Sequence, residues 1–231
     1  MEKPKKSRRK KLILWLGIDL TVAAIVILLL HHAPARYRPA TPPPDDPNGR
    51  RVHPYISHEL MPTLYNNSQD RKPFEIEVDE ESLNEAIAQA RWREESGGIR
   101  LFSPAIAFAP GRVVLMATAD IEGADFVVTV EIHPQILDDG RLNLIVESVK
   151  IGIIPITWAA KKLARDKYRE QVEAGGIDLD DWRTRIAASL LNEESFEPVF
   201  PVDDKWVRLT GIDIVQGRLA ARLVQVPKPK H

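Results

Sequence analysis

Residues 142–156 read LNLIVESVKIGIIPI, and residues 157–174 continue as TWAAKKLARDKYREQVEA. Aliphatic and β-branched residues dominate the first stretch, which predicts a strand over 142–154. Proline cannot donate a hydrogen bond to a neighbouring strand, so Pro155 ends this strand, and its fixed φ suits the first turn of a helix. The sequence therefore predicts a strand that leads directly into an amphipathic helix, which folds back onto the apolar face of its own sheet.

The predicted helix has two faces of different chemistry. One stripe is expected to be apolar and to pack on the sheet: Trp158, Ala159, Leu163, Ala164 and Tyr168. The other face is expected to point away from the sheet and is basic: Lys161, Lys162, Arg165, Lys167 and Arg169.

Three more strand-like runs precede this segment. Residues 99–109, 113–123 and 125–134 are joined by short turns, so together with 142–152 they predict an antiparallel meander. Alternation gives the sheet one apolar face: Val113, Leu115, Ala117, Ala119, Ile121, Phe126, Val128, Val130 and Ile132. The opposite face is polar: Thr118, Asp120, Glu122, Thr129, Glu131 and His133.

Further elements flank the meander. They are a strand over 74–78, a helix from the N-cap Asp79 toward Gly97, a helix over 178–194, and closing strands over 205–215 and 217–226. The predicted fold class is α+β: one N-terminal transmembrane helix, then a long twisted antiparallel sheet packed against two or three helices.

The N-terminus carries the strongest single signal. Residues 1–11, MEKPKKSRRKK, hold seven of the 32 basic residues, whereas residues 12–30 hold one charge, that of Asp19. At ~1.5 Å per residue, this apolar run spans about the ~30 Å hydrocarbon core of a bilayer. The positive-inside rule then predicts a cytoplasmic leader over 1–11, a single transmembrane helix over 12–32 and an extracytoplasmic remainder at the cell membrane.

Two alternatives stay open for this segment. The triplet at 33–35, Ala-Pro-Ala, would suit cleavage of a signal peptide, although a secretory apolar region is usually only ~7–15 residues long. Asp19 is either an acid tolerated in a very apolar segment or a contact for a partner helix, because an ion near the bilayer centre costs ~2.5–3.5 kcal/mol on insertion scales.

The remainder divides by composition. Residues 33–73 predict a proline-rich stalk, 74–226 one extracytoplasmic α+β domain, and 227–231 a tail. From residue 33 onward the chain has 25 basic and 31 acidic residues, and this net charge of −6 argues against nucleic acid as a partner. The absence of cysteine excludes disulfides and thiol chemistry.

No motif names a reaction, since P-loop, G-x-S-x-G, H-E-x-x-H and G-x-G-x-x-G patterns are all missing from the sequence. The polar groups that we weighed are Asp120, Glu122 and Asp125, then Asp178, Asp180 and Asp181, and finally His53, His58 and His133. The first set is interpreted as a hairpin turn, the second as helix capping, and the histidines as lacking the partners that a site needs. We therefore expect no enzyme, cofactor or metal site. The alternative hypothesis of an enzymatic function is an envelope enzyme that uses the loop carboxylates.

One phrase is shared with a known family. Its residues are Leu83 and Asn84, then Asp139, Gly140, Leu142, Leu144, Val146, Ser148, Ile151, Gly152 and Pro155. In these residues the chain resembles the YpmS-like family of uncharacterised, membrane-anchored extracytoplasmic bacterial proteins. The resemblance extends loosely over about residues 74–226, and only the phrase itself is specific. The resemblance implies no established activity, and its layout is similar to that of tubular lipid-binding domains, which implies lipid as a ligand.

The leading hypothesis is a membrane-anchored, extracytoplasmic binding or scaffold protein with lipid or another apolar molecule as its ligand. The residues expected to line a groove are Leu115, Phe126, Val128, Val130, Leu144 and Trp158. The alternative is a structural or interaction subunit of a cell-envelope complex, which binds an envelope protein and no small molecule. For the apolar face of the sheet, the alternative to a ligand groove is that the face is buried as an ordinary hydrophobic core.

Overall fold

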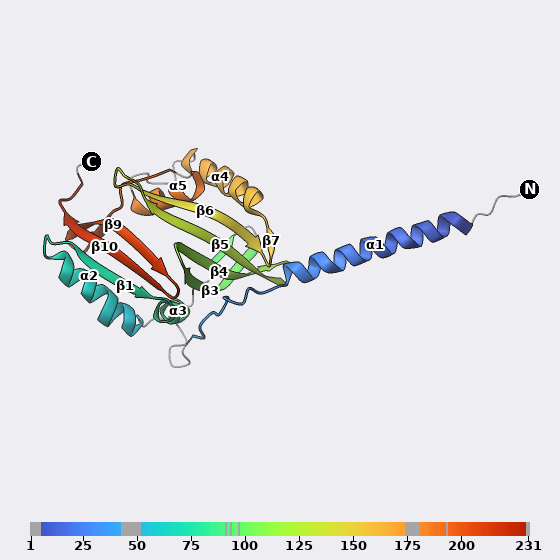
Figure 1. The fold of residues 1–231 in the computed structure, drawn as a ribbon, viewed down its shortest axis with the longest axis horizontal. Helices are drawn as coiled ribbons and strands as arrows, with labels where there is room; N and C mark the ends of the chain where they lie inside the picture. Colours follow the sequence, from blue (N-terminus) through green and yellow to red (C-terminus); the bar gives the residue numbers. More distant parts are fainter. Residues whose placement is uncertain are drawn as a thin grey trace, which may run out of the picture.

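The structure is a computed structural model that describes residues 6–42, 52–90, 92, 94–96, 98–173, 181–192 and 194–229. Figure 1 shows helix α1 (Lys6–Leu30) projecting away from a body in which helices flank curved antiparallel strands. Side chains of residues 15–28 of α1 are exposed, with Leu20 at 73% and Leu28 at 71%. No helix is both long and apolar enough to cross a membrane among the residues whose side chains are described, which in α1 begin at Trp15.

The body is built from strands in two sheets. The strands are β1 (Phe74–Asp79), β2 (Glu94–Ser96), β3 (Ile99–Ala109), β4 (Arg112–Ile121), β5 (Ala124–Ile136), β6 (Leu142–Ile151), β7 (Ile154–Pro155), β8 (Val199–Val202), β9 (Lys205–Val215) and β10 (Arg218–Val226). The helices after α1 are the π-helix η1 (Tyr55–Leu60), α2 (Met61–Ser68), α3 (Glu80–Gln89), α4 (Thr157–Glu173) and α5 (Trp182–Asn192).

All the strand pairs are antiparallel. One sheet has the order β1-β10-β9-β8, and the other has the order β2-β3-β4-β5-β6-β7. The α+β class, the meander from β3 to β6 and the closing hairpin of β9 and β10 are confirmed. The strands divide between two sheets, however, where the sequence pattern suggested one.

The two sheets meet at the tips of two hairpins. Gly111, in the turn between β3 and β4, donates a hydrogen bond of 2.9 Å to the carbonyl oxygen of Ile214. Gly217, between β9 and β10, donates one of 3.2 Å to Phe108. Both glycines have positive φ, 71° and 78°, which other residues adopt only with strain. The two tight turns therefore allow the sheets to curve around a shared interior (Figure 1).

The main core lies between the two sheets, α2 and α5. Its buried side chains are Leu142, Phe196, Val202, Val207, Leu209, Ala221 and Leu223. The backbones of Leu142 and Phe196 exchange hydrogen bonds of 2.8 and 2.9 Å, and the buried Ser189 hydroxyl accepts one of 2.9 Å from Leu144 N–H. Helix α5 and the segment after it thus cover the start of β6, and this part of the interior is filled.

Helix α4 follows β7 as predicted but turns a different face to the sheet. Ile156 packs on the buried cluster that contains Val149, and the Thr157 hydroxyl accepts a hydrogen bond of 2.9 Å from Val149 N–H. These contacts fix the rotation of α4 about its axis, which leaves Trp158 77% and Leu163 60% exposed. The predicted apolar stripe was therefore wrong for Trp158, Ala159 and Leu163, which are exposed, whereas Ala164 and Tyr168 are half-buried.

Part of the predicted stalk is folded. Residues 55–68 form η1 and α2, in which Tyr55 and Ser68 are buried and Leu64 packs on the main core. The helical periodicity is weak because the inward position one turn after Leu64 is a serine. Pro62 is compatible with α2 because it lies in the first turn, where its missing N–H is tolerated.

Residues 31–42, which we call the tether, connect α1 to the body without helix or strand. The Tyr37 hydroxyl donates a hydrogen bond of 2.8 Å to the carbonyl oxygen of Ser103 and lies 2.6 Å from the Thr118 hydroxyl. Tyr37 also packs on the buried cluster of Ala105, Ala107, Val114 and Met116, and burial raises the pKa of its phenol. The tether therefore runs over the polar face of the meander.

The end of α1 is held by the turn between β6 and β7. Ile153 N–H donates a hydrogen bond of 3.1 Å to the carbonyl oxygen of Leu29, and the His31 ring lies 4.9 Å from the Phe126 ring. Gly152 has a φ of 59°, and a Cβ on it would lie 2.2 Å from the Leu29 oxygen. Glycine is thus required where this helix approaches the sheet.

Candidate functional site

Helix α3 is fixed beside the edge of β3 by polar side chains. Asp79 is its N-cap, as predicted, because its carboxylate accepts a hydrogen bond of 2.8 Å from Ser82 N–H, which holds the pKa of Asp79 below its usual range. The buried Asn84 side chain donates to the Ile106 carbonyl oxygen at 2.7 Å and accepts from Ile106 N–H at 2.8 Å. Asn84 therefore takes the place of a neighbouring strand at this edge.

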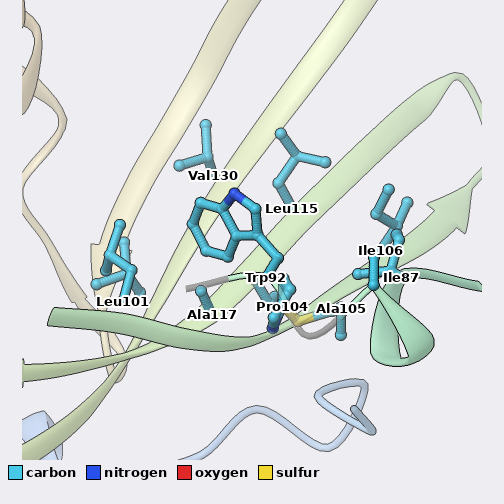
Figure 2. A pocket seen from close by; sticks show the side chains of 12 residues that line it. Ile87, Trp92, Leu101, Pro104, Ala105, Ile106, Leu115, Ala117 and Val130 are labelled. Carbon is cyan, nitrogen blue, oxygen red and sulfur yellow. The ribbon is translucent and has the colours of Figure 1, made fainter. Parts of the chain in front are cut away.

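Beyond α3 the chain places a tryptophan over the sheet. The helix ends at Gln89, earlier than predicted, because residues 94–96 pair with the start of β3 across the turn at Gly98. Trp92 lies in the segment between, 40% exposed. Figure 2 shows its indole ring over the strands near Leu115 and Val130.

Trp92 and α3 border an apolar hollow of about 430 Å³. The lining residues come from α3, the segment after it, β3, β4 and β5, and all are apolar: Ile87, Ala90, Trp92, Leu101, Pro104, Ala105, Ile106, Leu115, Met116, Ala117, Val128 and Val130. Leu115 is 36% exposed although it lies in the middle of β4, so the hollow is open to solvent. We call this site the apolar hollow.

The floor of the apolar hollow is set by strand register. Leu115 pairs with Val130, and Ala117 pairs with Val128, so these four side chains share one face of the sheet. This is part of the face that alternation predicted to be apolar. The small side chain of Ala117 leaves space in the middle of the floor, and Ile87 and Ile106 stand at one end of the hollow (Figure 2).

The six residues predicted to line a groove are placed in different environments. Leu115, Val128 and Val130 line the apolar hollow. Phe126 contacts His31 beside α1, and Leu144 packs in the core under α5. Trp158 is 77% exposed on α4, with the Lys162 ammonium 5.6 Å from its ring centre. The structure thus brings three of the six together, and their role as ligand contacts stays a prediction.

The sequence analysis did not identify the residues that form the sides of the apolar hollow. Leu101, Pro104 and Ile106 lie on β3, which is bulged between Phe102 and Ala105, so simple alternation does not assign their faces. Ile87 and Trp92 lie in the segment that was predicted to be a helix from Asp79 toward Gly97, but the sequence pattern could not show that these residues border an open space.

The chemistry of the apolar hollow is that of binding. None of its twelve lining residues carries a carboxylate, imidazole, hydroxyl or basic group, and the one side-chain hydrogen-bond donor is the indole N–H of Trp92. Proton transfer and nucleophilic attack need such groups within reach of a substrate. The hollow therefore offers desolvation and shape, which suit an apolar ligand.

The polar candidates from the sequence are engaged in local structure. Asp120 accepts a hydrogen bond of 2.9 Å from Gly123 N–H and forms an ion pair with Arg100, which lowers the pKa of Asp120, so the predicted hairpin turn is confirmed. His133 Nδ1 lies 2.7 Å from the carbonyl oxygen of Gly111. These groups hold turns in place.

The remaining candidates lie near helix ends. Asp181 accepts a hydrogen bond of 3.0 Å from Arg183 N–H at the start of α5, whereas residues 178 and 180 lie outside the described residues. His53 Nε2 lies 3.6 Å from a Glu85 carboxylate oxygen, and His58 Nδ1 lies 2.8 Å from the neighbouring Ser57 hydroxyl. Across the described ranges, no three His, Asp or Glu side chains are grouped as a metal site would need.

Comparison with known proteins adds no assignment to this geometry. No family model, no curated protein and no solved structure matches the chain. The resemblance to YpmS-like proteins therefore stays a prediction.

Proposed function

We propose that this protein is a membrane-anchored, extracytoplasmic binding protein whose apolar hollow takes the alkyl chain of a lipid or a similar apolar ligand. The observation that carries the proposal is the hollow of about 430 Å³, open to solvent and lined by twelve apolar residues. Its volume lies within the ~300–1,000 Å³ range of small-molecule pockets.

The physical argument for an apolar ligand is the cost of leaving this surface wet. Trp92 and Leu115 are 40% and 36% exposed beside the half-buried Val128 and Val130. Burial of apolar surface is favourable by about 25 cal/mol per Å², so an alkyl chain that displaces water from the hollow is stabilised along its length. A charged or strongly polar ligand would lose its hydration and gain only the indole N–H.

The proposed anchor is α1. It includes the nineteen residues 12–30, whose single charge is Asp19. These residues follow the basic leader 1–11, of which residues 6–11 form the start of α1. An apolar helix of this length matches the ~30 Å core of a bilayer, and the basic leader favours a cytoplasmic N-terminus. The contact between Leu29 and Ile153 would then hold the body close to the membrane surface from which its ligand comes.

The proposal is tested by counting lipids on the full-length protein. Native mass spectrometry of the chain, released from a detergent that does not strip lipids, is expected to show one bound lipid or fatty acid per chain. Ala117→Phe fills the middle of the hollow and is expected to remove this bound mass. Ala159→Phe adds the same bulk at an exposed position on α4 and is expected to keep it.

Two outcomes would reject the proposal. One is the absence of any bound apolar molecule from the wild-type protein. The other is equal occupancy in the Ala117→Phe and Ala159→Phe variants, because the bound lipid would then sit elsewhere on the protein. Protease added to intact cells tests the location separately, since the body is expected to be cleaved from outside while 1–11 is protected.

Asp19 favours a second candidate, a structural or interaction subunit of a cell-envelope complex. Its side chain is exposed on α1 and has no hydrogen bond or ion pair with another described residue. In a bilayer such a carboxylate is stabilised by a polar group on a partner helix. Crosslinking in membranes should then yield a product that Asp19→Leu loses and Thr21→Leu keeps, and an unchanged product in Asp19→Leu would reject this candidate.

A further inference from the structure

A second hollow, of about 460 Å³, lies between the tether and the opposite face of the same strands. Strand alternation explains the difference between the two sites. Val128 and Val130 line the apolar hollow, whereas Thr129 and Glu131, which alternate with them on β5, line the second hollow. Gly152, on which the end of α1 rests, also borders it. We call this site the polar hollow.

The charged side chains of the polar hollow are mostly cationic. Arg36 from the tether, Arg112 from β4 and Lys150 from β6 line it, against the single carboxylate of Glu131. Lys150 Nζ lies 2.6 Å from a Glu131 oxygen, and Arg112 Nε lies 2.5 Å from a carboxylate oxygen of Glu147. Arg36 has no ion pair or hydrogen bond with any other described residue. The three cations and the carboxylates of Glu131 and Glu147 together leave a net charge of +1 at this hollow, in a chain that is net acidic beyond residue 33.

Thr129 supplies a second, independent observation. It is 5% exposed, and its hydroxyl oxygen is buried without a hydrogen-bond partner among the described residues. Buried polar atoms in folded proteins almost always have a partner, in the protein or in a bound molecule. The Thr129 hydroxyl lies in the wall of the polar hollow, and it can donate a hydrogen bond to a bound group once the atoms that cover it move aside.

We propose that the polar hollow binds a phosphate group, with Arg36 and Arg112 on its oxygens and the Thr129 hydroxyl as a further donor. A phosphate offers several acceptor oxygens and a negative charge, and guanidinium groups match this geometry with two parallel donors. Lys150 stays paired with Glu131 and adds positive charge to the wall. Phosphate binding itself does not depend on the apolar hollow.

The same phosphate chemistry has two sources, and only one of them rests on the proposed membrane anchor. If α1 spans the bilayer, the contact of Gly152 with the end of α1 places the polar hollow at the level of lipid headgroups. A phospholipid headgroup would then be the ligand. Without the anchor, the ligand would be a soluble phosphate ester.

The test is calorimetric titration of the full-length protein in a non-ionic detergent at low salt. The probes are inorganic phosphate and water-soluble dihexanoyl phosphatidylglycerol. In the Ala117→Phe variant, which fills the apolar hollow, binding of both probes with the lipid at least about tenfold tighter identifies a headgroup site, and equal affinities identify a site for soluble phosphates. No binding of either probe overturns the proposal.

Variants separate a built site from general charge attraction. Arg36→Gln is expected to weaken phosphate binding at least about tenfold, whereas Arg38→Gln changes the same charge on the tether, outside the polar hollow, and is expected to stay within about twofold. Thr129→Val keeps the shape of the side chain and is expected to weaken binding about threefold or more. Equal affinities of the Arg36→Gln and Arg38→Gln variants overturn the proposal.

A further comparison keeps this proposal distinct from the first. Ala117→Phe alters only the apolar hollow and is expected to leave phosphate affinity unchanged. Loss of bound lipid in that variant, with phosphate binding intact, would show two separate sites. Lipid counting by mass spectrometry thus tests the apolar hollow, and phosphate titration tests the polar hollow independently.

Discussion

Ile153 N–H donates a hydrogen bond of 3.1 Å to the carbonyl oxygen of Leu29, so the turn after β6 satisfies one of the carbonyls at the end of α1. The last carbonyls of a helix have no partner within the helix itself. This contact joins the N-terminal helix to the sheet that carries both hollows.

Gly152→Ala is expected to separate α1 from the sheet, because the added Cβ would lie 2.2 Å from the Leu29 oxygen and 2.5 Å from the Leu30 oxygen. The tether should then be cut faster by trypsin after Arg36, and Ile153 N–H should exchange faster with deuterium. Limited proteolysis and hydrogen exchange measure both effects.

Gly123→Ala is the matched control for this substitution. Gly123 also has positive φ, 85°, but a Cβ there meets nothing within 4 Å. Both variants carry the strain of a left-handed residue, ~1–2 kcal/mol in unfolding free energy. Equal trypsin sensitivity of the tether in the two variants would contradict a specific contact between α1 and Gly152.

Affinity for alkyl ligands is expected to rise with chain length until the apolar hollow is full. Each buried methylene contributes ~0.8 kcal/mol, which is about a fourfold gain in affinity from water. Equilibrium dialysis with fatty acids of increasing length fixes the free aqueous concentration, and uptake by the Ala117→Phe variant is subtracted. An affinity that does not change with chain length would contradict the alkyl-binding role.

Asn84→Ala is expected to lower the free energy of unfolding by ~2–3 kcal/mol, because the N–H and carbonyl groups of Ile106 at the edge of β3 lose their buried partner. Urea unfolding followed by circular dichroism measures the loss. Asn66→Ala, at an exposed position on α2, serves as the control and should change the free energy by less than ~0.5 kcal/mol. Equal losses would show that Asn84 has no special bridging role.

Glu131 gives the stability a dependence on pH. Its hydrogen bond to Lys150 Nζ, 2.6 Å long, lowers the pKa of Glu131 below the ordinary value of 4.5. A carboxyl whose folded-state pKa is lowered stabilises the fold above the unfolded pKa, and this contribution is lost as the pH falls from 4.5 through the folded value.

Glu131→Gln should therefore lose less stability on acidification than the wild-type protein. The difference is expected to be ~0.5–1 kcal/mol in unfolding free energy, because the pair is partly exposed. Urea unfolding at several pH values measures it, with Glu170→Gln, at an exposed position on α4, as the control. Parallel pH profiles for the wild-type and Glu131→Gln proteins would contradict the role of this pair.

Local sequence rules predicted the individual elements well where a single residue decides them. Asp79 begins α3, and Gly123 forms the turn between β4 and β5. The predicted strand over 142–154 is wrong at its end, because β6 ends at Ile151 and the chain turns at Gly152, so that Pro155 lies in β7 and pairs with Lys150. Alternation along β4 and β5 also predicted which side chains share a face, because each of these strands has an uninterrupted register with the other.

The same rules failed where a contact distant in sequence determines the local structure. Trp158 points outward because Thr157 is bound to Val149, and α2 forms in a proline-rich segment because Leu64 has the main core to pack against. Neither partner is visible in a local pattern. Tertiary packing overrode helical periodicity in both places.

The amino-acid pattern alone specified the longer strands β1, β3 to β6, β9 and β10, but not the short strands β2, β7 and β8. It also specified the antiparallel order of the meander, the two faces of its strands and an apolar N-terminal run, since these follow from periodicity, turn residues and composition. The tertiary structure decided that part of the apolar face stays open under Trp92 while the rest is filled by α5. It also decided that the tether covers the polar face. The reason is physical: a hollow exists only where packed elements fail to meet, and that depends on contacts between residues far apart in the chain.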